Sequence, residues 1–151
     1  MNLTELNNRF PEGLDAVKYF EFLRWGLLIK CTYCNSSKIN RRYSDYRFHC
    51  GECSKVFSVT SGTFLHGTRI PLKSWLYAFS IASNLKNEIS IRQLQRDINV
   101  SYTTAWLMYK DIVALMKDEA CENKESEEIL EHLCKKVISS NMSPQQLNMA
   151  I

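Results

Sequence analysis

Apolar residues recur at intervals of three and four along several stretches of the chain, which is the spacing of one face of a helix. After Pro11 this pattern predicts a helix over 14–25 that ends at Gly26. A second helix is predicted over 72–85, directly after Pro71, because its large apolar side chains keep the same interval. Both helices are therefore expected to bury one face.

Two shorter helices are predicted on either side of a break at Asn99 and Val100. Ser90 is suited to cap the first, which runs through Ile98, and Ser101 to cap the second. The side chains expected to face inward are Ile91, Leu94 and Ile98 in the first helix and Ala105, Met108, Ile112 and Leu115 in the second. Such a pair is a candidate helix-turn-helix. An ordinary helical hairpin is the alternative.

Residues 31–59 have a different pattern. Short segments rich in Tyr, Phe, Val and Arg are interrupted by turn-forming residues at 35–37, 44–45 and 51. This predicts small strands joined by turns.

The end of the chain is rich in Glu but keeps a narrow apolar stripe at helical spacing. The stripe consists of Ile129, Leu130, Leu133, Cys134, Val137 and Ile138. A last short helix is expected to start at Ser143 and Pro144.

These elements predict an α+β fold. Its parts are an N-terminal helical segment (1–30), a small β region (31–70), an all-α helix-turn-helix region (71–117) and an acidic helical tail (118–151).

The chain has 151 residues and a formal net charge of +3, and this charge is unevenly distributed. Residues 31–75 hold seven basic and two acidic side chains, whereas 118–151 hold three basic and seven acidic ones. A basic middle suits a nucleic-acid surface, although a solvated surface is the alternative. The chain has neither a membrane-spanning apolar run nor a signal-peptide start, so we expect no membrane partner and a cytoplasmic protein, nucleoid-associated if bacterial.

The cysteine spacing is the most specific feature of the sequence. Cys31 and Cys34 form one C-x2-C pair, and Cys50 and Cys53 form another after fifteen intervening residues. This spacing predicts that the β region 31–70 is a zinc ribbon with one zinc ion held by four sulfurs. The zinc is expected to be structural, because a closed thiolate site leaves no position for water or substrate. The alternative is four reduced cysteines that serve as small apolar residues. Cys121, His132 and Cys134 in the tail are too irregularly spaced to predict a second site, and we interpret them as helix residues.

Basic and aromatic residues alternate between the two cysteine pairs. Phosphate contact is predicted for Lys38, Arg41, Arg42 and Arg47. The alternative is that they are solvated strand residues. Phe48 and Phe57 are expected to pack around the metal, the roles of Tyr43 and Tyr46 stay open, and His49 is interpreted as a surface or base-contacting residue.

In a helix-turn-helix, the start of the second helix lies against base edges in the major groove. The residues predicted to contact DNA here are Ser101, Tyr102, Thr103, Thr104, Trp106 and Lys110, with Arg92 and Arg96 on the outward face of the first helix.

Six motifs occur together in one order. They are Phe10-Pro11 with a helix that ends Leu23-Arg24-Trp25, Cys31-x-x-Cys34, Tyr46-Arg47-Phe48-x-Cys50-x-x-Cys53, the segment 57–63, Pro71-Leu72-x-x-Trp75, and Ser101-Tyr102-x-Thr104-Ala105-Trp106. In these motifs, over about residues 10–117, the chain resembles the transposase zinc-ribbon family of ISXO-type insertion sequences. The resemblance implies the N-terminal DNA-recognition region of a bacterial transposase, which binds the terminal inverted repeats of its element.

The chain departs from the family in two places. Thr32 and Asn35 stand where the family has Pro and Gly, and Asn tolerates the left-handed backbone that this turn needs. The Val-Glu-x-Asp-Glu type segment that opens the family's ribonuclease-H-like catalytic domain is absent, and 34 residues after Lys117 are too few for that domain. We therefore expect no catalytic residues and no enzyme activity.

The leading hypothesis is a zinc-dependent, sequence-specific protein that binds double-stranded DNA, derived from a transposase without its catalytic domain. It would act as a regulator or as a terminal-repeat-binding subunit. One alternative is a recognition fragment with no present function. Another is a protein-interaction module in which residues 122–138 bind a partner protein or a second copy of the chain.

Overall fold

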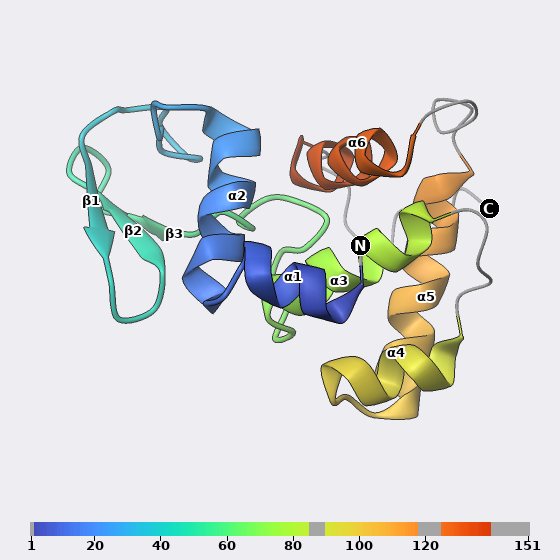
Figure 1. Cartoon of the computed structure of the whole chain (residues 1–151). Coiled ribbons are helices and arrows are strands. Elements are labelled where there is room, and N and C mark those ends of the chain that lie inside the picture. Colours follow the sequence, from blue (N-terminus) through green and yellow to red (C-terminus); the bar gives the residue numbers. More distant parts are fainter. Residues whose placement is uncertain (1, 85–89, 118–124, 140–151) are drawn as a thin grey trace.

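A three-stranded antiparallel sheet forms one end of the molecule, and helices form the rest (Figure 1). The structure is a computed structural model that describes residues 2–84, 90–117 and 125–139. In chain order its elements are α1 (Leu3–Arg9), α2 (Gly13–Trp25), β1 (Ile39–Arg42), β2 (Arg47–Cys50), β3 (Val56–Phe57), α3 (Leu72–Ser83), α4 (Ile91–Ile98), α5 (Tyr102–Met116) and α6 (Ser126–Ser139). The predicted α+β class is confirmed.

The sheet has the order β1-β2-β3, with β2 in the centre. Ile39 lies opposite Cys50 in the first pairing, and Phe48 lies opposite Phe57 in the second. Because side chains alternate along a strand, Phe48 and Cys50 are buried on one face while Arg47 is exposed on the other. We call residues 31–57, which comprise this sheet and both cysteine pairs, the ribbon.

The helices share one hydrophobic core. Leu76 and Phe79 of α3 are fully buried, and α6 lies across both α3 and α2 (Figure 1). The apolar stripe predicted in the tail supplies this contact, since all six of its side chains are at most 5% exposed. The predicted segments 1–30, 71–117 and 118–151 therefore contribute to a single core in the described part of the chain.

The pair α4 and α5 forms as predicted. The Ser90 side chain caps α4 by accepting a hydrogen bond from Gln93 N, and the Ser101 side chain caps α5 by accepting one from Thr104 N. Asn99 ends α4 in the left-handed conformation with a φ of 52°. Residues 99–101 alone separate the two helices, which contact one another.

One helix and one helix end differ from the sequence prediction. Helix α1 was not predicted, although its capping box is visible in the sequence, since Asn2 and Glu5 each bond the other's backbone N–H. Helix α3 ends at Ser83, two residues before the predicted end. The helix expected at 143–144 lies outside the described residues, as do 122–124 of the predicted partner-binding segment.

Candidate metal centre and nucleic-acid interface

The four cysteines of the ribbon converge on one point. Their Sγ atoms all lie within 4.8 Å of one another, with 3.6 Å between Cys31 and Cys53 and 3.5 Å between Cys34 and Cys50. Four sulfurs at about 2.3 Å from one tetrahedral zinc would be roughly 3.8 Å apart. The cluster can therefore hold a metal ion, and its geometry fits zinc.

The turns after the first cysteine of each pair stabilise thiolates. Asn35 adopts a left-handed φ of 60°, which lets its N–H bond the carbonyl of Cys31 and close the first turn. Tyr33 N donates to Cys31 Sγ and Glu52 N donates to Cys50 Sγ, each over 3.4 Å. The backbone N–H of Cys53, followed by that of Glu52, lowers the pKa of Cys50 to about 6. This thiol is thus readily ionised for metal binding.

An aromatic cluster covers the cysteines on the side of α2. Phe48 and Phe57 stack with ring centroids 5.4 Å apart, and Trp25 meets both edge-on at 5.9 and 6.0 Å. Cys31 and Cys50 are buried in the same cluster, which is separate from the helical core. The predicted packing of Phe48 and Phe57 around the metal site is confirmed.

The tail residues do not extend this site. Among the described residues no metal-ligating group forms with His132 or Cys134, and Cys121 lies outside them. Cys134 is fully buried in the core, where burial raises the pKa of its thiol.

The basic residues predicted to contact DNA from the ribbon occupy two environments. Three are on the surface in exposed ion pairs: Lys38 with Glu52 at 3.0 Å, and Arg42 and Arg47 with Asp45 at 3.2 and 3.9 Å. Such pairs are weak and can exchange for a phosphate. Tyr43 and Tyr46 are exposed beside them, and His49 is half-buried on β2.

Arg41 is in the other environment. Its guanidinium makes a two-bond ion pair with the buried carboxylate of Glu21 on α2, with N–O distances of 3.1 and 2.6 Å. The guanidinium also lies over the Phe48 ring, 4.7 Å from its centroid. Through these contacts the Arg41 side chain connects the ribbon to α2.

One face of α5 is exposed from its first residue onward. The side chains of this face, which we call the α5 face, are Tyr102, Thr103, Trp106, Leu107 and Lys110. Tyr102 is 50% exposed, Trp106 43% and Leu107 49%, and Lys110 Nζ lies 5.6 Å from the Trp106 ring centroid. The opposite face, which includes Ala105 and Met108, is buried in the core.

Two of the residues predicted for the interface take part in the cap of α5. Ser101 Oγ accepts a hydrogen bond from Thr104 N and lies 2.8 Å from Thr104 Oγ1, so the two side chains are also hydrogen-bonded to each other. On α4, Arg92 is exposed, while Arg96 is exposed and donates to Gln93 Oε1 over 3.3 Å. The structure thus brings these residues to the same end of the molecule as the α5 face.

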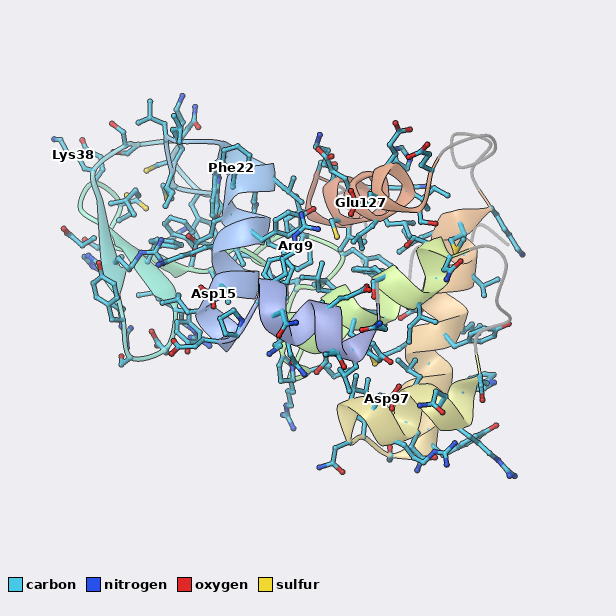
Figure 2. All side chains as sticks on the ribbon, viewed as in Figure 1. Arg9, Asp15, Phe22, Lys38, Asp97 and Glu127 are labelled. Carbon is cyan, nitrogen blue, oxygen red and sulfur yellow. The ribbon has the colours of Figure 1, made fainter. Side chains whose placement is uncertain are left out.

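The ribbon and the α4–α5 pair lie at opposite ends of the molecule. Figure 2 shows Lys38 at the outer edge of the ribbon and Asp97 on α4 at the other side. The two groups of predicted DNA-contacting residues therefore form separate surfaces.

The sequence analysis did not identify two residues that matter in this region, Glu21 and Leu107. Glu21 is a charged residue on the otherwise apolar buried face of α2, a position that signals a buried partner. Leu107 is an apolar residue outside the inward stripe of α5, next to Trp106. An apolar pair on an outward face is the signal that could have found it.

No family model matches the chain, and no solved structure matches it significantly. A curated protein that it resembles is described as an uncharacterized protein in transposable element ISH50 of Halobacterium salinarum. The two are 30% identical over 101 residues, which cover 64% of this chain and 33% of the relative. The chain thus spans about a third of the relative's length. The resemblance associates it with an insertion sequence, as its motifs predict.

The described helices include none that combines the length and apolar character needed to cross a bilayer.

Proposed function

We propose that the chain is a zinc-dependent, sequence-specific protein that binds double-stranded DNA of a transposable element. In this proposal α4 and α5 act as a helix-turn-helix, with α5 as the recognition helix in the major groove. The ribbon is a zinc ribbon of the transposase type, and its metal is structural.

The α5 face is the observation that carries the proposal. A recognition helix needs exposed side chains in its first turns together with a buried opposite face that fixes its position. Tyr102, Thr103 and Trp106 meet the first requirement, and buried Ala105 and Met108 meet the second. A threonine hydroxyl can bond a base edge, its methyl group can contact the methyl of thymine, and Lys110 is suited to a phosphate.

The chemistry of the ribbon supports a role in recognition and not in strand transfer. A four-thiolate site is closed, so its zinc offers no coordination position to water or to a phosphate. The similar protein from a transposable element suggests the terminal repeats of such an element as the DNA. We therefore propose a regulator or a terminal-repeat-binding role for these residues.

A selection of the zinc-loaded chain against a random duplex library tests the proposal. We expect the retained DNA to share a motif, and Thr103→Ala to change the preferred base at one or two positions of it. The matched control is Thr4→Ala, which removes an exposed threonine from α1, outside the α4–α5 pair.

Retention without any common motif, or equal loss of affinity on every sequence for Thr103→Ala, would contradict α5 as the recognition helix. Strand transfer by the chain alone would contradict a purely recognising role.

A second candidate function is protein association, and a specific surface favours it. At the end of α2, Phe22 is 59% exposed, Leu27 95% and Leu28 64%. Exposed apolar groups of this size commonly mark interfaces. The apolar stripe of α6, in contrast, is covered by α2 and α3 of the same chain. Sedimentation of the wild type and of a Leu27→Ser/Leu28→Ser variant tests self-association, which the substitutions should abolish.

A further inference from the structure

A groove lies between the ribbon and the segment that connects β3 to α3. This cavity, of about 640 Å³, is bordered by β2 and β3, by residues 58–61 and 66–70 and by the first residues of α3. The connecting segment is the green loop that passes beside α2 in Figure 1. We call the cavity the ribbon groove.

The ribbon groove is electropositive. Its basic side chains come from three different segments: Arg47 from β2, Arg69 from the connection and Lys73 from α3. Asp45 is the one acidic residue among those that line it, and Arg42 and Arg47 pair with its carboxylate. No carboxylate of the described residues pairs with Arg69 or Lys73. The groove is therefore complementary to an anion.

The wall of the groove is held in place before any ligand arrives. Phe64 and Leu65 anchor the connection in the helical core at 1% and 2% exposure. Backbone bonds from Thr63 N to Thr60 O and from His66 N to Thr63 O fold it into successive turns. Trp75 Nε1 donates to Thr68 Oγ1 over 3.1 Å, which ties the connection to α3. A fixed wall lowers the entropic cost of binding.

His66 is oriented as a hydrogen-bond donor toward its surroundings. Gly62 N donates to His66 Nδ1 over 3.0 Å, and an acceptor nitrogen of a neutral imidazole carries no proton. The proton is then on Nε2. Because the side chain is exposed at the groove, this N–H is available to a ligand oxygen.

We propose that the ribbon groove binds the sugar-phosphate backbone of duplex DNA, with phosphate oxygens contacted by Arg69, Lys73 and the Nε2–H of His66. The proposal rests on the function proposed above and adds a second contact surface to it. Exposed Tyr33 and Tyr46 at the rim, and Arg47 and Arg42 on the adjoining sheet, extend the same surface along a nucleic-acid strand. The α5 face would specify sequence, and the groove would supply salt-sensitive affinity.

The test measures the salt dependence of binding between the full zinc-loaded chain and a random-sequence duplex. Each basic side chain that contacts a phosphate releases a counterion, so the loss of two such contacts makes the slope of log affinity against log salt shallower by about 2. For Arg69→Gln/Lys73→Gln we therefore expect the loss of affinity between 50 and 200 mM salt to be about tenfold smaller than for the wild type. The matched control is Lys18→Gln/Lys30→Gln, which removes two exposed charges that do not line the groove.

The control should keep the wild-type slope, and both variants should keep their zinc content and unfolding temperature. An unchanged slope for the folded Arg69→Gln/Lys73→Gln variant would overturn the proposed phosphate contacts in the groove. It would not affect the proposal that the α5 face contacts bases. A wild type that binds no duplex at all would overturn both proposals together.

Chemical shifts of residues 58–70 distinguish DNA from a free anion. We expect these residues to shift on addition of the duplex and the duplex to displace inorganic phosphate. Shifts with inorganic phosphate alone, and none with the duplex, would overturn the proposal.

Discussion

Arg41 on β1 and Glu21 on α2 form a two-bond ion pair in which the Glu21 side chain is only 5% exposed. The pair is a polar connection between the ribbon and the helical part of the molecule. Glu21 raises the pKa of Arg41 further above its ordinary value through this hydrogen bond, and the guanidinium also covers the Phe48 ring. A side chain that first suggests phosphate contact thus joins two parts of the fold.

We expect Arg41→Met to destabilise the chain by about 3 kcal/mol, because it leaves a buried carboxylate without a partner. Arg42→Met is the matched control, since Arg42 is the next residue and its pair with Asp45 is largely exposed. We expect it to cost less than about 1 kcal/mol. Urea unfolding measures both. Equal losses for the two variants would contradict the structural role of Arg41.

A double variant separates the charge from the packing. In Glu21→Met/Arg41→Met no unpaired charge remains, so we expect it to recover much of the stability lost in Arg41→Met. A double variant that is less stable than Arg41→Met would show that the unpaired Glu21 carboxylate does not account for the stability lost in Arg41→Met.

Metal removal should affect the ribbon and leave the helical core folded, because the two have separate apolar clusters. In Cys53→Ser, or after chelation, we expect zinc loss, exposure of Trp25 and a red shift of its emission, with most helical circular dichroism retained. Trp25→Phe identifies the source of the emission change. Cys134→Ser is the control, since it replaces a fully buried cysteine outside the site and should lower stability without changing zinc content. Complete loss of helix on chelation would contradict independent clusters.

The sequence predicts those elements whose signals are local. The cysteine spacing, the caps at Ser90 and Ser101 and the apolar stripe of α6 each depend on nearby residues, and the structure contains all of them. What it could not predict depends on tertiary contact. The use of Arg41 depends on Glu21, twenty residues away, and the burial of the α6 stripe depends on α2 and α3. The ribbon groove joins three segments whose approach no local pattern encodes.

A hydrogen bond from α3 connects the core to α4. Tyr77 Oη donates to Asp97 Oδ2 over 2.5 Å, while Gln93 donates to the other oxygen of the same carboxylate. Burial, followed by this bond and the charge of Asp97, raises the pKa of Tyr77. We expect Tyr77→Phe to lower the free energy of unfolding by about 1–2 kcal/mol.

Tyr109→Phe is the control for this change, because the Tyr109 hydroxyl makes no hydrogen bond with the described residues. If α5 reads DNA, Tyr77→Phe should also weaken binding without altering the slope against salt, since it displaces the helix and removes no charge. A change in the slope would contradict that interpretation.

Asp111 on α5 gives the stability a defined dependence on pH. Burial raises the pKa of this carboxyl to about 6, against the smaller opposing influence of Lys110. Because the folded state binds the proton more tightly than the unfolded state, ionisation of Asp111 costs stability as pH rises from about 4 to 6. The cost is complete above pH 6 and absent below pH 4. Because the Asp111 side chain is only partly buried and solvent screens its charge, we expect the cost to be about 1 kcal/mol.

Asp111→Asn removes this ionisation and should make the chain more stable than the wild type at pH 7 by that amount. The difference between the two proteins should disappear toward pH 4. Protonation of the metal-binding thiols destabilises both proteins alike in acid, so the comparison isolates Asp111. Urea unfolding at a series of pH values measures the difference. A gap that is constant with pH, or one that widens in acid, would show that the carboxylate is already well solvated in the folded chain.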